Sequence, residues 1–334
     1  MPNDAPTPNL DELVRSPFTR LAGLLTGSEP GLPPINLSLG EPHALMPPFL
    51  GPVIAQHLAE FGRYPPIRGI PTLREAIAGW IGRRYPALHG AIDPERHVLP
   101  LNGSREGLFS AIFPALARKP GVAHPAVLIP NPFYQVYAAA AGGAGVTPAF
   151  LPCHVENRFL PALEEIDEAL FARAAAFYLC SPSNPEGAVA SREYLARAIA
   201  LARRYDFMLF ADECYSEIYS GEPPPGVLEV AQGLTGSLAN VLVFQSLSKR
   251  SGLPGLRSGF VAGDPEFIAR SAASATWRAR RCHSPSSTCR RQLGPTRAMP
   301  RRAGLSTGPI SIRRTRFWVA ATATGGLEAA SFCG

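Results

Sequence analysis

One of only two lysines in the chain lies where an amine could do chemistry. Lys249 ends the segment Gln245-Ser246-Leu247-Ser248-Lys249, and thirty arginines provide the remaining Lys and Arg charge. A lysine amine can lose its proton and form an imine with a carbonyl compound, and arginine cannot replace it in that reaction. Alone, Lys249 would be interpreted as a surface residue in a polar loop, so its neighbours decide the interpretation.

Those neighbours include groups that bind phosphate. Ser246 and Ser248 offer hydroxyls beside the amine, and Arg257 follows eight residues later within Gly255-Leu256-Arg257-Ser258-Gly259. A guanidinium binds two phosphate oxygens at once. Hydroxyls, an amine and a guanidinium at this spacing predict a site for a phosphorylated aldehyde cofactor.

The elements that must position these groups alternate along the chain. Continuous apolar runs alternate with segments of helical periodicity, which favours an α/β domain on a mainly parallel sheet. Ligands of such sheets bind beyond the carboxyl ends of the strands. The predicted strands are 127–129, 177–180, 207–211 and 241–244, and the predicted helices include 71–81, one that Ser104 caps, and 191–205.

Polar clusters follow three successive predicted strands. They are Ser181–Gly187, Asp212–Tyr215 and Ser246–Lys249. Each cluster alone is weak, because Asn-Pro turns and strand-end aspartates are common. Together, and in this order, they indicate a single site.

These clusters resemble the fold-type I pyridoxal-phosphate enzymes, and specifically the class I/II aminotransferases. The resemblance runs from Leu37 to Asp264, and within the family it is greatest for the succinyldiaminopimelate aminotransferases of bacterial lysine synthesis. It implies a mainly parallel seven-stranded sheet with helices on both faces. It divides the chain into an N-terminal arm with part of a small domain (1–45), a cofactor-binding large domain (46–265) and a basic tail (266–334). The motifs that carry it are Asn184-Pro-x-Gly187, Asp212-x-x-Tyr215, Ser246-x-Ser248-Lys249 and Gly255-x-Arg257-x-Gly259.

The resemblance implies a role for each residue around the cofactor ring. Lys249 would bind pyridoxal 5′-phosphate covalently and then transfer the proton. Asp212 would pair with the protonated ring nitrogen, which keeps the ring an acceptor of electrons. Asn184 and Tyr215 would donate hydrogen bonds to its phenolic oxygen. Tyr134 would stack on the ring, although the nearby Phe133 and Tyr137 leave that assignment open.

The phosphate and the substrate have their own expected residues. Ser246, Ser248 and Arg257 would bind the phosphate from one side, and the helix start at Gly103-Ser104-Arg105 would offer backbone N–H groups from the other. Tyr64 matches a tyrosine that reaches the phosphate of a neighbouring subunit, which implies a homodimer with shared sites. Gly40, with Tyr64 and Asn184, would contact the substrate.

Composition excludes several other classes. Hydrophobic residues make up 46% and charged residues 17% of the 334 residues, as in a globular chain. The N-terminus has no signal-peptide pattern, and no apolar run reaches the length of a membrane span, so we expect a cytoplasmic protein.

No metal site is predicted, because Cys282, His283 and Cys289 do not have common zinc-site spacing. Gly142, Gly143 and Gly145 lie in an Ala-rich helical stretch and form no phosphate loop. The six cysteines show no disulfide framework.

The net charge of +6 is concentrated in the last part of the chain. Residues 271–334 carry eleven arginines and one acid, Glu328, while residues 1–270 have a net charge of −4. The family pattern stops after about Arg270. A neighbouring reading frame of GC-rich codons for 280–297 can encode a helix-like continuation, so we predict a frameshift. A genuine basic tail that binds nucleic acid is the alternative.

The expected function is amino-group transfer between glutamate or 2-oxoglutarate and a keto acid, here N-succinyl-2-amino-6-oxopimelate. Three alternatives stay open. One is a different specificity (aspartate, aromatic or alanine aminotransferase, or a carbon–sulfur lyase). Another is a protein that binds the cofactor without turnover, because the abnormal tail replaces the carboxylate-clamping small domain. The third, nucleic-acid binding, has no support from the acidic body of the chain.

Overall fold

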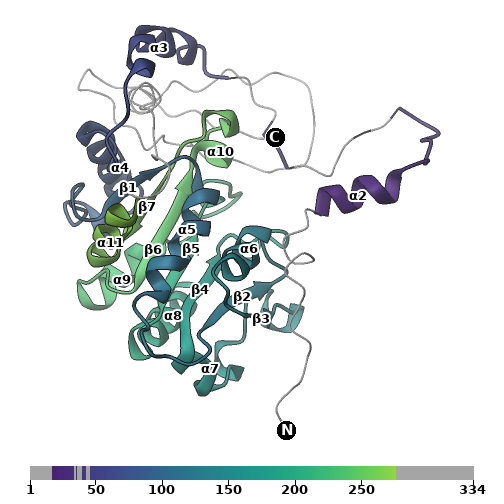
Figure 1. Ribbon diagram of the computed structural model, residues 1–334, viewed down its shortest axis with the longest axis vertical. Coiled ribbons are helices and arrows are strands. Elements are labelled where there is room, and N and C mark those ends of the chain that lie inside the picture. Colours follow the sequence, from purple (N-terminus) through teal and green to yellow (C-terminus); the bar gives the residue numbers. More distant parts are fainter. Residues whose placement is uncertain (1–16, 34, 36–39, 43–45, 276–334) are drawn as a thin grey trace.

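A seven-stranded sheet forms the centre of the molecule (Figure 1). The computed structural model describes residues 17–33, 35, 40–42 and 46–275. The strand order is β1-β7-β6-β5-β4-β2-β3, and only β7 runs antiparallel to its neighbours. The predicted mainly parallel seven-stranded α/β sheet is therefore confirmed. The strands are β1 Val98–Leu101, β2 Ala126–Asn131, β3 Pro148–Pro152, β4 Ala174–Cys180, β5 Met208–Asp212, β6 Val241–Ser246 and β7 Gly259–Gly263.

Helices cover both faces of the sheet, so successive strand residues enter two separate cores. Leu128 and Phe177 pack in the first core with α4, α8 and α9, while Val127 and Tyr178 pack in the second with α5, α6 and α11. Burial on both faces explains why the strands are continuously apolar. The helices are α2 Pro17–Leu25, α3 Leu50–Gln56, α4 Pro71–Arg84, α5 Ser104–Leu116, α6 Gln135–Gly143, α7 Glu168–Arg173, α8 Arg192–Arg204, α9 Val227–Thr235, α10 Leu247–Arg250 and α11 Pro265–Ala275.

Strand register aligns the polar clusters along one edge of the sheet. Cys180 pairs with Asp212 across β4 and β5, and Asp212 pairs with Phe244 of β6. On the far side, Gly259 of β7 pairs with both Ser246 and Leu101. The carboxyl ends of β1, β4, β5 and β6 thus meet at one edge, and the segments that follow them lie together.

Local sequence signals set the starts of α4 and α8 as predicted. Pro71 is the first residue of α4, and the Ser191 hydroxyl caps α8 by accepting a hydrogen bond from the Tyr194 N–H. The predicted cap at Ser104 is wrong. Gly103 occupies the N-cap position of α5 without a side-chain cap, and Ser104 is the first helical residue.

Part of the sequence-based account concerns residues that the structure does not describe. The basic tail beyond residue 275, the frameshift hypothesis and Cys282, His283 and Cys289 lie outside the described ranges. The domain boundary at 265/266 stays a prediction, and α11, which crosses it, packs Phe267 and Ile268 into the core. No helix within 17–33 or 46–275 has the length and hydropathy to cross a membrane.

A buried carboxylate lies directly behind the edge that carries the clusters. Glu213 is 3% exposed, and it accepts hydrogen bonds from the Val227 N–H at 2.7 Å and the Tyr85 hydroxyl at 3.1 Å. Arg84 forms its ion pair with Glu217 at 2.6 Å instead. Burial raises the pKa of Glu213 to about 7, although these hydrogen bonds act in the opposite direction. In the folded chain the carboxyl therefore favours its protonated form below about pH 7.

This raised pKa predicts a pH-dependent stability. The folded chain binds the proton more tightly than the unfolded chain, so the free energy of unfolding should fall as the pH rises from about 4.5 to about 7. The loss should be on the order of 3 kcal/mol and complete above pH 7. Glu213→Gln should flatten this slope in denaturant unfolding between pH 5 and 8. The exposed Glu222→Gln is the control, and an unchanged slope in Glu213→Gln would exclude Glu213 as its source.

Candidate active site at the carboxyl edge of the sheet

Lys249 lies in the short helix α10, directly after β6. Its Nζ donates a hydrogen bond to the backbone carbonyl of Gly40. A Cβ atom at position 40 would lie 3.9 Å from that Nζ. The structure therefore brings together Lys249 and Gly40, which are far apart in sequence.

Asp212 ends β5 as a buried carboxylate. It is 4% exposed, and it accepts hydrogen bonds from the Tyr137 hydroxyl at 2.8 Å and the Cys214 N–H at 3.3 Å. Burial raises the pKa of Asp212, and these donors oppose the rise. Within the described ranges, no basic side chain forms an ion pair with Asp212. A positively charged partner would therefore stabilise its ionised form.

Tyr137 is a site residue that the sequence did not identify. The sequence placed it among three neighbouring aromatic residues as a possible stacking residue. In the structure it is buried in α6, its ring stacks on Tyr178 at 4.6 Å between centroids, and its hydroxyl faces Asp212. Tyr134, in contrast, is half-buried at the start of α6, and its hydroxyl accepts a hydrogen bond from Arg105 Nε at 2.5 Å. Arg105, whose guanidinium also lies 5.5 Å from the ring centroid, therefore fixes the Tyr134 side chain at the start of α6.

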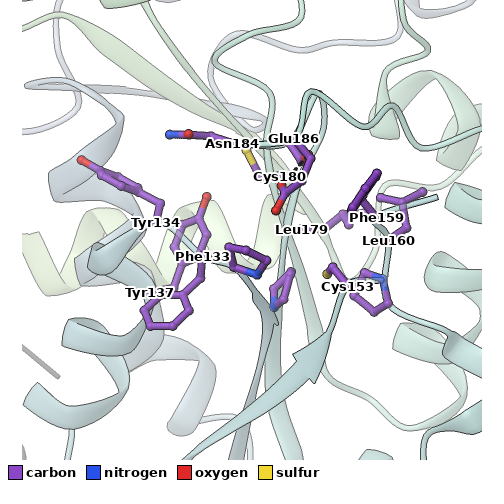
Figure 2. Close-up of a pocket in the computed structure, with 14 residues that line it drawn as sticks. Phe133, Tyr134, Tyr137, Cys153, Phe159, Leu160, Leu179, Cys180, Asn184 and Glu186 are labelled. Atoms are coloured by element: carbon purple, nitrogen blue, oxygen red, sulfur yellow. Dashed lines mark hydrogen bonds between the residues drawn. The ribbon is translucent and has the colours of Figure 1, made fainter. Parts of the chain in front are cut away.

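Asn184 and Tyr215, which the sequence assigns to the same oxygen of the cofactor, lie within hydrogen-bond distance of each other. Asn184 Nδ2 donates to the Tyr215 hydroxyl at 3.2 Å, which joins the loop after β4 to the loop after β5. Burial raises the pKa of Tyr215, so its phenol keeps its proton at neutral pH. Figure 2 shows the Asn184 side chain extending toward Tyr134, with Tyr137 beside them.

Three small polar side chains gather where β6 and the start of α5 meet. The Cys214 thiol donates to Ser104 Oγ at 3.1 Å, and Ser246 Oγ donates to the Cys214 sulfur at 3.7 Å. Ser246 also caps α10 by accepting the Ser248 N–H at 3.3 Å. Burial raises the pKa of the Cys214 thiol, so it stays neutral among these hydroxyls. Cys214 was not predicted, because nothing in the Asp-x-x-Tyr spacing distinguishes it.

The Arg257 guanidinium lies against Gly103, the residue that precedes Ser104 of this polar group. It donates to the carbonyls of Pro254 at 3.1 Å and Asn102 at 3.2 Å. Gly103 has a φ of +92°, and a Cβ there would come within 2.4 Å of Arg257 Nη2. Glycine at 103 is therefore required both for the backbone angle and for the guanidinium.

Gly259 allows β7, β6 and the start of α5 to lie close together. A Cβ at Gly259 would lie 2.6 Å from the Gln245 carbonyl oxygen and 3.0 Å from the Ser104 nitrogen. Only a residue without a side chain lets β7 pair with β6 while the start of α5 lies against it. Gly259 of the Gly-x-Arg-x-Gly motif therefore allows the start of α5 to approach the sheet, while Gly103 leaves the room for the guanidinium.

Comparison with protein families agrees with this arrangement. Residues 33–291 match the family described as aminotransferase class I and II, a longer match than the stretch found from motifs alone. This chain belongs to that family. It is 36% identical over 251 residues to an LL-diaminopimelate aminotransferase of Desulforudis audaxviator, and 34% identical over 244 residues to one of Aquifex aeolicus. These alignments cover 74% and 72% of this chain but only 61% and 60% of the relatives' lengths.

Solved structures of the family share the fold. An aminotransferase of Neisseria meningitidis superposes with a TM-score of 0.77 at 36% identity, covering 84% of this chain and 71% of the other. The aminotransferase AspB of Helicobacter pylori superposes with a TM-score of 0.76 at 34% identity, over 82% and 71%. The fold-type I architecture follows from this similarity.

The residues fit the cofactor that this family uses, pyridoxal phosphate. The buried Asp212 has no basic partner in the described part of the chain, which suits a protonated ring nitrogen. Because Gly103 has no side chain, the Arg257 guanidinium lies close to the first N–H groups of α5. This arrangement suits a phosphate. Of the other predicted residues, Tyr64 is 79% exposed and Ser248 is half-buried in α10.

A side chain at position 103 should lower the affinity for the cofactor. Gly103→Ala should lower the affinity for pyridoxal phosphate at least about tenfold, since a methyl group at 2.4 Å must displace the Arg257 guanidinium. Gly121→Ala is a matched control, because Gly121 has a similar φ of +81° and open space around it. Fluorescence titration of both variants measures the affinity for pyridoxal phosphate. Equal losses in the two variants would exclude the displacement of Arg257 as the cause.

Removing the Tyr137 hydroxyl predicts a different pattern. Tyr137→Phe takes a donor from the buried Asp212, so the pKa of Asp212 should rise further and its pairing with a cationic ring should weaken at low pH. Cofactor affinity should fall about three- to tenfold at pH 6 and less at pH 8.5. Tyr178→Phe is the control, because its hydroxyl donates to the Leu108 carbonyl. A loss that does not vary with pH would contradict this role.

Proposed function

We propose that this chain is a pyridoxal-phosphate-dependent aminotransferase that exchanges an amino group between glutamate or 2-oxoglutarate and a longer keto acid. One observation carries the proposal. The carboxyl edge of the sheet brings together the amine of Lys249, the buried carboxylate of Asp212 and the guanidinium of Arg257. Each is of the chemical type that the cofactor's aldehyde, ring nitrogen and phosphate require.

The residues of this chain would share the work as follows. Pyridoxal phosphate, when bound, supplies an aldehyde that reacts with amines and a ring that accepts electrons from the substrate. Arg257, Ser246 and the N–H groups of Ser104 and Arg105 would hold the phosphate. Asp212, positioned by Tyr137, would keep a proton on the ring nitrogen.

The remaining groups would orient the ring and move protons. Tyr215 and Asn184 would donate to the phenolic oxygen, and Tyr134, fixed by Arg105, would cover one face of the ring. Lys249 would take a proton from Cα of the amino acid that gives up its amino group. It would return a proton to Cα of the keto acid that receives the amino group. In this structure the Gly40 carbonyl accepts a hydrogen bond from the Lys249 amine. A substrate that enters the site would displace this hydrogen bond and contact the amine instead.

For the substrate we propose an amino acid of the diaminopimelate type. The motifs resemble succinyldiaminopimelate aminotransferases, whereas the relatives found by comparison are named LL-diaminopimelate aminotransferases. These substrates share a seven-carbon chain and differ at the distal amine, which is succinylated in one and free in the other. Half-reactions with both amino donors, and with aspartate and alanine, would separate the specificities.

We also propose that the enzyme works as a homodimer. Helix α2 stands apart from the sheet in Figure 1, and its apolar side chains Phe18, Leu24 and Leu25 are 44–73% exposed in the single chain. Tyr64 is also exposed, as a residue that reaches a neighbouring phosphate would be. Light scattering of the purified chain tests the association.

The two lysines allow a direct test of the central role. After loading with pyridoxal phosphate and borohydride reduction, mass spectrometry should find the cofactor on the peptide that contains Lys249. Lys249→Ala should abolish that adduct and the conversion of glutamate to 2-oxoglutarate. Lys119→Ala is the matched control, because Lys119 donates to the Tyr205 carbonyl at 2.5 Å at the other end of β5. A Lys249→Ala chain that keeps the adduct would overturn the assignment.

A further inference from the structure

The helix that carries Lys249 is too short to be stable by itself. Helix α10 has four residues, Leu247–Arg250, and isolated helices of this length do not form in water. The position of the Lys249 amine therefore depends on what holds α10 against the rest of the chain. Leu247 and Arg250 are buried, whereas Ser248 and Lys249 are partly exposed. Because residues three apart lie on the same side of a helix, Leu247 and Arg250 form the inner face of α10.

Arg250 is held on this inner face by an aromatic ring. Its guanidinium carbon lies 4.0 Å from the centroid of the Trp80 ring in α4, and both side chains are 1% exposed. The Trp80 ring in turn meets Phe260 of β7 edge to face, at 6.0 Å between centroids. A cation over an aromatic ring is attracted more strongly when water is excluded from the pair. This contact therefore joins the end of α10 to α4 and β7.

The buried guanidinium keeps its positive charge. Burial lowers the pKa of Arg250 to about 9, and the carboxylate of Glu217, itself buried, acts in the opposite direction. Arg250 is therefore a cation at neutral pH. In contrast to an apolar side chain, a planar cation over a ring has a preferred geometry, so the contact with Trp80 sets the orientation of α10 as well as its position.

The same part of α4 also contacts the segment that follows Asp212. Tyr85 directly follows α4, and its hydroxyl donates to Glu213 at 3.1 Å. Glu213 is the residue after Asp212. Arg250 is likewise the residue after Lys249. The end of α4 therefore contacts the chain directly beside both of these groups.

We infer that Arg250 is a positioning residue for Lys249, because its contact with Trp80 fixes α10 so that the amine faces the aldehyde of the bound cofactor. The inference rests on the proposed aminotransferase function. In the step concerned, the Lys249 nitrogen bonds to the aldehyde carbon, and the aldehyde oxygen leaves as water. Arg257 and Asp212, which would hold the phosphate and the ring nitrogen, lie outside α10. Loss of the contact should therefore weaken the covalent step and leave the other contacts of the cofactor in place.

Two forms of the cofactor separate this role from a general effect on binding. Pyridoxamine phosphate has the same ring and phosphate as pyridoxal phosphate but an amine in place of the aldehyde, so it cannot bond to Lys249. Arg250→Met keeps an unbranched apolar stem and removes the guanidinium. It should lower the affinity of the full-length chain for pyridoxal phosphate about tenfold. The affinity for pyridoxamine phosphate should change less than about twofold, and fluorescence titration measures both.

Two further variants control for the loss of a buried arginine. Arg250→Lys keeps a cation that can lie over the Trp80 ring, so it should restore most of the affinity for pyridoxal phosphate. Arg74→Met is the matched control, because Arg74 is 4% exposed in the same helix as Trp80. Its guanidinium donates to the Gly69 carbonyl and to Glu95 instead, so this variant should keep the wild-type ratio of the two affinities. Equal losses for both cofactor forms in Arg250→Met, or no loss for either, overturn the inference.

A measurement on the cofactor-free chain separates the inference from the proposed function. Hydrogen exchange followed by mass spectrometry reports how often the backbone of 247–253 opens. Arg250→Met should raise the exchange rate of this segment about tenfold and leave that of β5 unchanged. Faster exchange in this segment supports Arg250 as the anchor of α10 even if no amino donor reacts. An unchanged rate overturns the inference even if the wild type converts glutamate normally.

Discussion

A carboxylate buried at the end of β5 is the constraint on which the rest of the site depends. Taking the charge of Asp212 out of water is costly unless donors and a cation surround it. Tyr137 and the Cys214 N–H provide the donors, and the chain as described provides no cation. A positively charged group beside Asp212 would therefore stabilise its ionised form, and this is the role that we propose for the ring nitrogen of the cofactor.

The sheet supplies the positions of those residues through its register. Because β1 and β6 both pair with β7 at Gly259, the start of α5 and the start of α10 lie side by side. Gly259 and Gly103 remove the side chains that would prevent this approach and leave room for Arg257. Positive charge for a phosphate and negative charge for a ring nitrogen thus lie at separate places along one edge.

The sequence predicted the parts of this arrangement that depend on residue type. Lys249, Asp212 and Arg257 stand out as candidates because an amine, a carboxylate and a guanidinium follow strand ends in a recognisable order, and the strand at 177–180 is recognisable because both of its faces are buried. The sequence did not reveal Tyr137, because only the packing of α6 decides which of three nearby aromatic hydroxyls faces Asp212. The cap position was misassigned because Ser is a preferred N-cap residue, whereas the chain has Gly103 there with a φ of +92° and no side-chain cap.

The protonation of the cofactor's ring nitrogen tests the central claim most directly. With pyridoxal phosphate labelled with ¹⁵N in the ring, the nitrogen chemical shift of the bound cofactor reports whether that nitrogen carries a proton. The account predicts a protonated nitrogen at neutral pH in the wild type and an unprotonated one in Asp212→Asn. An unprotonated nitrogen in the wild type, or one that Asp212→Asn leaves protonated, would contradict it.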